Sequence, residues 1–189
     1  MNIEQILNHL TTTTPIYTAD LPRDKSGIYG LVDHTGHLRY IGSTSGASEN
    51  FRKRIHHRHR TGSETHSHYF SKIYNSGRMW RDRSTQQNDP DAKIAKDLRS
   101  SFIAEYCRAV YYPIDGSKQE IEAQEAAVIL IAPVESVRWN RSTTLTYPEP
   151  VELVEKLLNK LGFTAPQREA IERQKIRWQS RIGATIVGI

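Results

Sequence analysis

The sequence predicts an α+β fold in which a small three-stranded antiparallel sheet is flanked by helices. Residues 27–33 and 38–44 are strand-forming runs on either side of the turn-forming string HTGH at 34–37. A third run, within 101–114, is rich in aromatic and β-branched residues, which strands favour. Apolar residues at helical spacing occupy much of the remaining chain.

Composition and charge are those of a soluble globular protein. The 189 residues are 37% hydrophobic and 25% charged, which suits one domain or one domain with an appendage. Cys107 is the only cysteine, so an internal disulfide and a cysteine-rich metal site are both excluded, as is usual in a reducing cytosol. The first residues do not resemble a signal peptide, and no run of about 18 apolar residues exists. We therefore expect a cytoplasmic protein of prokaryotic or phage-like type, without a membrane partner.

Helices are expected where apolar residues recur at helical spacing before a glycine or proline. They cover about 1–10, 48–61, 65–76, 91–99, 118–132, 151–161 and 166–182. Ser48 is the expected cap of the second helix, and Gly62, Gly77, Pro133 and Gly162 are expected stop residues. An extended segment between prolines leads to the first strand, and the polar string 82–92 predicts a loop.

Three segments follow from this order of elements. Residues 1–25 form an N-terminal helix and an extended lead-in, and residues 26–142 form the domain that contains the sheet. The string YPEP at 147–150 is typical of a linker, and the segment 143–189 around it predicts a helical, basic C-terminal extension.

Two tyrosines of the predicted hairpin lie together on one face of its sheet. Antiparallel pairing around the turn gives the pairs Tyr29–Gly42, Leu31–Tyr40 and Asp33–Leu38. Alternation places Tyr29, Leu31, Leu38, Tyr40 and Gly42 on one face, where glycine would leave the Tyr29 ring open to a ligand. Paired aromatics also stabilise hairpins, so the hairpin alone does not indicate a function.

The helix expected at 48–61 is strongly basic. The string FRKRIHHRHR at 51–60 contains five Lys/Arg and three His, and RMWRDR at 78–83 adds three arginines, a clustering typical of a nucleic-acid surface. With Phe51 and Ile55 on the buried side, Arg54 lies at the edge of the apolar stripe. His57 and Arg58 would project from the same side of an α-helix, three and four residues further on. The alternative is that these basic residues form a solvated face of the helix. For Arg52 and Lys53 we adopt that interpretation.

A carboxylate falls in the apolar stripe of the helix after Ser117. Glu125 is four residues after Ile121 and three before Val128, both of which are apolar. A buried carboxylate is costly unless it is paired or binds a metal. A salt bridge to a nearby arginine is therefore the structural alternative to a metal ligand.

Taken together, these strings resemble the GIY-YIG nuclease family. GIY at 27–29 and YIG at 40–42 match its two name-giving motifs, and Arg54, Glu125, Pro133 and Asn140 follow in the family's order. The resemblance covers about residues 26–140. It implies a small three-stranded antiparallel sheet flanked by helices, and hydrolysis of phosphodiesters with one Mg²⁺ or Mn²⁺ per active site.

The resemblance also implies roles for individual residues. Tyr29 would take the proton of the attacking water, Tyr40 would orient the scissile phosphate or assist Tyr29, and Arg54 would stabilise the phosphorane. Glu125 would bind the metal, and Asn140 would brace the site by hydrogen bonding. Several members carry a histidine four residues after the arginine, where this chain has Arg58. We expect His57 to take that role, with His59 and Arg58 as alternatives.

The remaining basic residues bear on the substrate, which we expect to be DNA, with no small-molecule cofactor. The expected DNA contacts are Lys53, Arg58, Arg78, Arg81 and Arg83. Trp80 is equally well explained as a core residue. The basic residues of 168–181 suit DNA, whereas Leu157, Leu161 and Trp178 would suit the face of a homodimer.

The predicted function is that of a stand-alone DNA endonuclease of restriction type. Nicking, single-strand, repair and mobile-element nucleases are the alternatives within the same chemistry. Outside it, a catalytically inactive nucleic-acid-binding module would bind DNA without cutting it, and a structural interaction domain would do neither.

Overall fold

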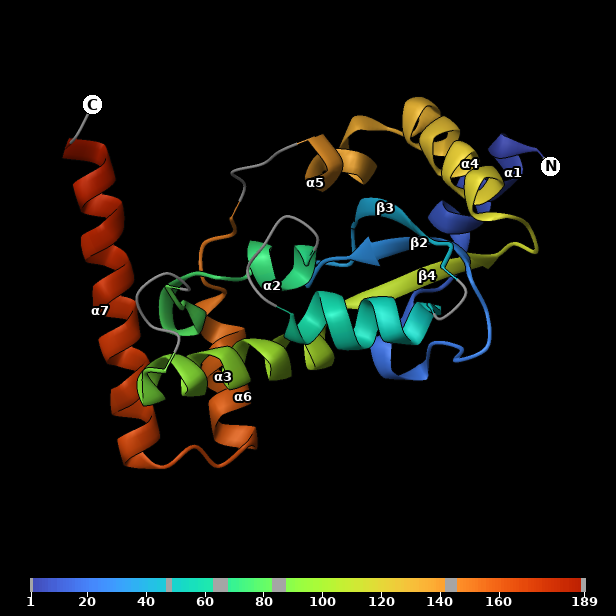
Figure 1. Cartoon of the computed structure of the whole chain (residues 1–189). Helices are drawn as coiled ribbons and strands as arrows, with labels where there is room; N and C mark the ends of the chain where they lie inside the picture. Colours follow the sequence, from blue (N-terminus) through green and yellow to red (C-terminus); the bar gives the residue numbers. More distant parts are fainter. Residues whose placement is uncertain (1, 47–48, 63–67, 83–87, 142–145, 188–189) are drawn as a thin grey trace. The chain divides into compact units, whose positions relative to one another are not determined.

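The computed structural model describes residues 2–46, 49–62, 68–82, 88–141 and 146–187, with side chains up to residue 182. The described chain is α+β, with one four-stranded antiparallel sheet in the order β1-β4-β2-β3 (Figure 1). It divides into two compact units, the first comprising 1–60 and 104–144 and the second 61–103 and 145–189. This division differs from the expected one, because residues 61–103 group with the C-terminal helices.

The sheet contains the three expected strands and a fourth. The expected strands are β2 (Gly27–Val32), β3 (Leu38–Thr44) and β4 (Arg108–Pro113). The fourth, β1 (Ile16–Tyr17), pairs with β4 through Ile16 opposite Ala109, so the predicted number of strands is wrong by one. A strand of two residues is too short to show the alternation by which strands are recognised.

The hairpin register confirms two of the three expected pairs. Tyr29 lies opposite Gly42 and Leu31 opposite Tyr40, but a bulge after Leu31 pairs Val32, in place of Asp33, with Leu38. Leu38 therefore packs with the core on the other face of the sheet, so its expected place beside the tyrosines is wrong.

Asp33 closes the turn of the hairpin. Its buried carboxylate accepts hydrogen bonds from Thr35 N at 2.9 Å, His37 N at 3.0 Å and Arg39 Nε at 2.9 Å. Side-chain bonds of this kind compete with strand pairing and are common in turns. They explain why Asp33 leaves the ladder.

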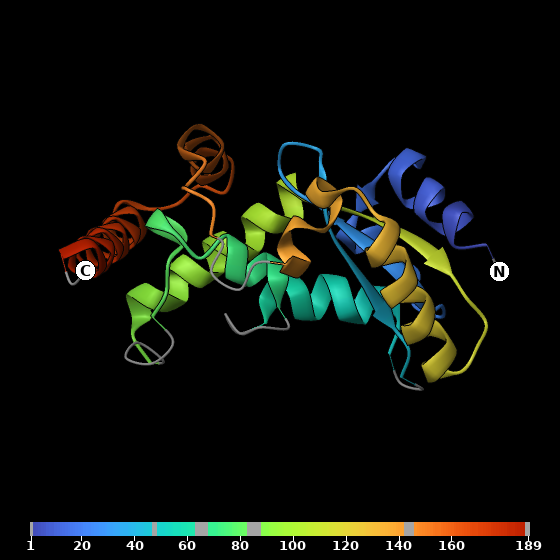
Figure 2. The same cartoon turned by 90° about the horizontal axis from the view of Figure 1, so that it is seen from above.

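Two helices cover one face of the sheet. They are α1 (Ile3–Thr12) and α4 (Lys118–Ile131), which lie side by side above the sheet (Figures 1 and 2). Their buried residues share a core with Ile28 and Ile41 of the hairpin. Ser117 caps α4 in a capping box with Glu120. The short helices η4 (Val134–Val137) and α5 (Arg138–Arg141) follow.

A basic helix covers the opposite face, drawn in turquoise below the sheet in Figure 1. It occupies residues 51–61, and its central part, η2 (Lys53–His59), is a π-helix. Phe51 and Ile55 are fully buried, with the Phe51 ring centroid 5.2 Å from that of Tyr111. The expected cap, Ser48, lies outside the described residues. Before the hairpin the chain forms a short helix, η1 (Thr18–Asp20).

The second unit is helical. It contains α2 (Tyr69–Ile73), η3 (Gly77–Met79), α3 (Pro90–Tyr106), α6 (Val151–Lys160) and α7 (Ala165–Val187), the last residues of α3 belonging to the first unit. α3 has 17 residues, so the helix predicted at 91–99 continues to Tyr106 and takes up the first part of the run 101–114, which was expected to contain the third strand. Gly162, with φ of +65°, ends α6 as predicted.

Buried aromatic and aliphatic side chains hold this unit together. Tyr74 stacks against Phe102 with ring centroids 5.2 Å apart, and Trp80 is only 9% exposed, so it is a core residue. Across residues 2–187, leaving out the undescribed segments, no helix combines the length and the apolar character that crossing a membrane requires.

Candidate active site

The two tyrosines of the hairpin converge, but both are buried. Their ring centroids are 6.1 Å apart, Tyr29 is fully buried and Tyr40 is 7% exposed. Gly42 is what allows this approach: a Cβ added to it would lie 2.6 Å from Cε1 of Tyr40 and 2.7 Å from the Tyr29 hydroxyl. The expectation that Gly42 leaves the Tyr29 ring open to a ligand is therefore wrong, since the space over the glycine holds the two phenols.

The basic helix contributes a guanidinium and an imidazole to the Tyr29 hydroxyl. Nε2 of His59 lies 2.7 Å from this oxygen, and Nε of Arg54 donates to it at 3.5 Å. His59 is fully buried and also lies against Tyr40, with ring centroids 5.8 Å apart. The sequence-predicted residues Tyr29, Tyr40 and Arg54 are thus brought together.

The π-helix explains why His59, and not His57, reaches the tyrosines. In an α-helix, residues five apart point about 140° away from each other. In a π-helix, whose hydrogen bonds join residues i and i+5, they lie one turn apart on the same side. Arg54 and His59 are so related, whereas His57 and Arg58 are exposed. The placement of His57 beside Tyr29 is wrong because it assumed α-helical spacing.

Glu125 shares a pocket with Arg54. The pocket has a volume of about 370 Å³ and lies between the end of β3, the start of the basic helix and α4. Ser43 donates a short hydrogen bond to Oε2 of Glu125. The predicted carboxylate therefore faces the same space as the predicted arginine.

Three residues of this site could not be recognised from the sequence. Ser43 follows Gly42 on β3, and Glu122 lies one turn before Glu125 on α4. Glu49 also lines the pocket, where its Oε1 binds Arg58 at 2.7 Å, while its buried Oε2 has no hydrogen-bond partner among the described residues. None of the three belongs to a recognisable motif, so the sequence contains no signal that singles them out.

Asn140 supports the site through the backbone of β3. Its Oδ1 accepts from Ile41 N at 3.0 Å and its Nδ2 donates to Ile41 O at 2.7 Å. These two bonds act like a further strand, pairing with the residue between Tyr40 and Gly42. The position agrees with the bracing role that the resemblance implies.

Burial dominates the acid–base properties of the site. It raises the pKa of Tyr29 to about 12, against the opposing effect of Arg54, which favours the phenolate. Burial also raises the pKa of Glu125, helped by the negative charge of Glu122 and opposed by the hydrogen bond from Ser43. For Tyr29, removal from water outweighs the cation of the basic helix, so the phenol is a weaker acid than in water.

The donor set of the pocket suits a hard divalent cation. Mg²⁺ binds through one or two carboxylates and keeps several of its waters, so it does not need a cage of protein ligands. Glu125 supplies a carboxylate, and the buried Oε2 of Glu49 is an oxygen for which the described residues provide no donor. In the described ranges no cluster of three or more His, Cys, Asp or Glu is arranged to hold a metal ion.

Arg78, which was expected to contact DNA, is a structural residue. It is 6% exposed, and its Nε binds Glu149 at 2.5 Å and its Nη1 binds Glu155 at 2.8 Å. Two carboxylates hold the guanidinium inside the second unit, so the prediction of a DNA contact is wrong.

The other expected DNA contacts have different surroundings. Lys53 and Arg58 are each 44% exposed and lie 3.8 and 2.7 Å from Oε1 of Glu49. Arg81 is tied by its backbone to Asn75, with hydrogen bonds of 2.8 and 3.1 Å. Arg83 lies outside the described residues. DNA contact by Lys53, Arg58 and Arg81 stays a prediction.

Basic side chains of α7 form ion pairs within the second unit. The pairs are Arg168–Glu155, Arg173–Asp91, Lys175–Glu172, Arg177–Asp89 and Arg181–Asp82. Each cation has a carboxylate partner, so this helix is less suited to DNA than its composition suggests.

Comparison of the chain with protein-family models, with curated proteins and with solved structures finds no significant match in any of the three.

Proposed function

We propose that this protein is a metal-dependent DNA endonuclease that hydrolyses phosphodiester bonds at the pocket shared by Arg54 and Glu125. One observation supports the proposal most directly. A phenol, a guanidinium and an imidazole meet at the Tyr29 hydroxyl, and the same guanidinium lines a pocket with the Glu125 carboxylate. An anion-binding group, a proton path and a metal-binding acid at one place are what phosphodiester hydrolysis requires.

Tyr29 and His59 form the proposed proton path. Tyr29 is fully buried, and Arg54 lies between its hydroxyl and the pocket, so movement of the guanidinium onto the phosphate would open this hydroxyl to the attacking water. The oxygen of the water then attacks phosphorus, its proton passes to the Tyr29 oxygen, and the Tyr29 proton passes to Nε2 of His59. The bond from phosphorus to the leaving oxygen breaks, and that oxygen takes a proton from solvent. Because burial raises the pKa of Tyr29 to about 12, a free phenolate is scarce at neutral pH, so Tyr29 accepts a proton as it gives one up.

Arg54 is the proposed partner of the phosphate. Its guanidinium is permanently charged and planar, and it can donate to two phosphate oxygens at once. Stabilising the charge that develops in the transition state is worth about 10²- to 10³-fold in kcat for a single donor. Tyr40, which lies against both Tyr29 and His59, would orient the phosphate or support Tyr29.

Glu125, with Glu49 beside it, would hold Mg²⁺ or Mn²⁺. Such an ion, when bound, neutralises phosphate charge and lowers the pKa of its water. Ser43 keeps the Glu125 carboxylate oriented toward the pocket.

Cleavage of supercoiled plasmid DNA with Mg²⁺ tests the proposal. We expect the wild type to cut, and Glu125→Ala and Tyr29→Phe each to lose about 10²-fold or more of the rate, because they remove the metal-binding acid and the proton path. Glu152→Ala, which removes an exposed glutamate of α6, is the matched control and should cut as the wild type does. EDTA should abolish cutting.

Retention of full activity by Glu125→Ala would contradict the proposal. A wild type that shifts DNA in a gel, with affinity falling steeply as salt rises, but leaves it uncut would identify a binding module instead. Whether the enzyme is of restriction type is tested separately, by sequencing the ends of cleaved random-sequence DNA.

A further inference from the structure

A second pocket of the first unit is lined almost entirely by cations. It has a volume of about 390 Å³ and is lined by Arg23, Asn50, Arg52, Lys53 and His57. None of these lining residues is acidic. Glu49, outside the lining, forms an ion pair with Lys53, with its Oε1 3.8 Å from Nζ.

The backbone holds the two arginines of this pocket on adjoining segments. Arg52 N donates to Pro22 O at 3.3 Å, and Phe51 N donates to Lys25 O at 3.2 Å. These bonds fix the segment that carries Arg23 against the start of the basic helix. Oδ1 of Asn50 caps the same helix by accepting from Lys53 N at 2.8 Å. These hydrogen bonds hold the segments that carry the cations close together, so the cations cannot separate to relieve their mutual repulsion.

The electrostatics of neighbouring groups agree with a strongly positive pocket. The pKa of His57 is lowered, first by burial and then by Arg52, Arg60 and Arg23. The pKa of His56 is lowered to about 4, again by burial and then by Arg60 and Arg52. Both rings therefore lie in a field that opposes a further positive charge.

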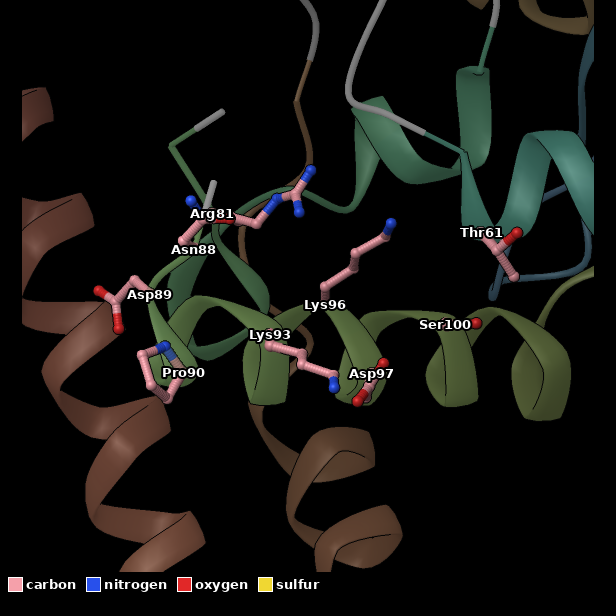
Figure 3. A pocket seen from close by; sticks show the side chains of 9 residues that line it. All are labelled: Thr61, Arg81, Asn88, Asp89, Pro90, Lys93, Lys96, Asp97 and Ser100. Carbon is pink, nitrogen blue, oxygen red and sulfur yellow. The ribbon is translucent and has the colours of Figure 1, made fainter. Parts of the chain in front are cut away.

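The large pocket of the second unit offers a contrast (Figure 3). It has a volume of about 760 Å³, and its lining mixes the cations Arg81, Lys93 and Lys96 with Asp89 and Asp97. Mixed charge of this kind does not select an anion. The lining of the pocket at Arg52, in contrast, contains no carboxylate.

We propose that the pocket formed by Arg23, Arg52, Lys53 and His57 binds a backbone phosphate of the DNA, separate from the phosphate that is cleaved. Two guanidinium forks and an ammonium group match the geometry and charge of a phosphate. That the phosphate belongs to DNA rests on the proposed function. The inference gives His57 a phosphate-binding role in place of the catalytic one that its spacing predicted.

The pocket adjoins the catalytic one across the basic helix. Lys53 and Asn50 line the cationic pocket, while their sequence neighbours Arg54 and Glu49 line the catalytic pocket. A helix is about 10 Å wide, which is comparable with the groove widths of B-DNA. A phosphate held here would fix the position of the duplex while Arg54 engages the scissile group.

DNA binding by variants in a Glu125→Ala background, which leaves the duplex uncut, tests the inference. The probe is a fluorescent duplex of about 20 base pairs, with hydroxyl ends or with 5′ phosphates, titrated at several KCl concentrations. We expect Arg23→Ala/Arg52→Ala to weaken binding about 10-fold and to lower the salt slope by about 1, the value for one phosphate. The control is the double variant Arg138→Ala/Lys156→Ala, which removes the same charge from two exposed positions.

Loss of affinity for both duplexes supports the inference. Loss confined to the phosphorylated duplex would show that the pocket takes a terminal phosphate, and would overturn it. Equal affinity and slope in the double variant and its control would overturn the inference, even if the wild type cuts DNA. If the wild type neither binds nor cuts DNA, the proposed function fails. The pocket is then tested with inorganic phosphate, which should shift the His57 ring resonances in the wild type and not in Arg52→Ala. Absence of that shift would overturn the inference as well.

Discussion

At the scale of single residues, the site depends on what burial does to a phenol. Tyr29 has no exposed surface. Its hydroxyl occupies the space above Gly42 and is in contact with His59 and Arg54. Water cannot stabilise a phenolate there, so the proton must be exchanged with a neighbour. The imidazole of His59, 2.7 Å away, is the group that can accept it.

One prediction concerns the titration of Tyr29. Burial raises its pKa from 10.0 to about 12, so between these pH values the native protein keeps a proton that the unfolded chain releases. The free energy of unfolding therefore falls as the pH rises through this interval, and is unaffected by this group below it. Ultraviolet titration of the folded protein should contain a late phenol transition near pH 12 that Tyr29→Phe removes. The exposed-residue control Tyr17→Phe should keep that transition.

A second prediction concerns Gly42. A methyl group at this position would lie within 2.8 Å of both phenols, so Gly42→Ala must push them apart. We expect a loss of about 1–3 kcal/mol in the free energy of unfolding, as in other overpacked sites, together with loss of cleavage. Chemical denaturation and the plasmid assay measure the two effects.

Gly116→Ala is the matched control for this substitution. Its added Cβ would come no nearer than 3.3 Å to a flexible glutamate oxygen. It should therefore have much the smaller effect, and equal effects of the two substitutions would contradict the packing argument.

At the scale of elements, the π-helix decides which histidine serves the site. Its wider turn places Arg54 and His59, five residues apart, on the side that faces the tyrosines. His57 lines the cationic pocket instead, together with Arg52 and Lys53 from the start of the same helix. One element therefore presents Arg54 and His59 to the tyrosines and His57 to the cationic pocket.

The third prediction tests this register. His59→Gln removes the proposed proton acceptor, and we expect kcat to fall about 10²- to 10⁴-fold, as is typical when a general acid–base group is lost. His37→Gln, in the exposed turn of the hairpin, should leave kcat as it is. Single-turnover cleavage at saturating DNA measures kcat for both. Wild-type kcat in His59→Gln would show that the imidazole takes no part in the chemistry.

At the scale of the whole molecule, charge is divided between structure and surface. The net charge of +5 suggests a polyanionic partner, but Arg78 and the basic residues of α7 are paired with carboxylates inside the second unit. In the first unit, Arg23, Arg52 and Lys53 instead line one pocket that has no acidic residue in its lining. Counting basic residues along the sequence does not distinguish these two uses.

The fourth prediction follows for Arg78. Removing one partner of a buried ion pair leaves the other uncompensated, so Arg78→Ala should lower the free energy of unfolding by about 3–5 kcal/mol. Arg168→Ala breaks a more exposed pair with Glu155 and should cost about 1 kcal/mol or less. Denaturant unfolding compares the two. A change in the salt slope of DNA binding in folded Arg78→Ala would instead favour the original expectation of a DNA contact.

The sequence by itself determined the features that depend on neighbouring residues. The hairpin and its pairing of Tyr29 with Gly42, the capped helix that carries Glu125 and the end of α6 at Gly162 all follow from local patterns of apolar, capping and turn residues. These patterns act over a few residues, so they can be recognised without the fold. That Tyr29, Tyr40, Arg54 and Glu125 belong to one site was predicted by the order of motifs that resembles the GIY-YIG family, and not by these local patterns.

Only the tertiary structure decided the features that depend on packing between distant segments. The burial that raises the pKa of Tyr29, the strand β1 and the pairing of Arg78 with Glu149 arise from contacts between segments far apart in the chain. The π-helical pitch of Lys53–His59 is likewise seen only in the structure. Periodicity cannot distinguish His57 from His59 before the pitch of the helix is known. It also cannot distinguish a DNA-binding arginine from one whose carboxylate partner lies 71 residues away, because that partner is brought near only by folding.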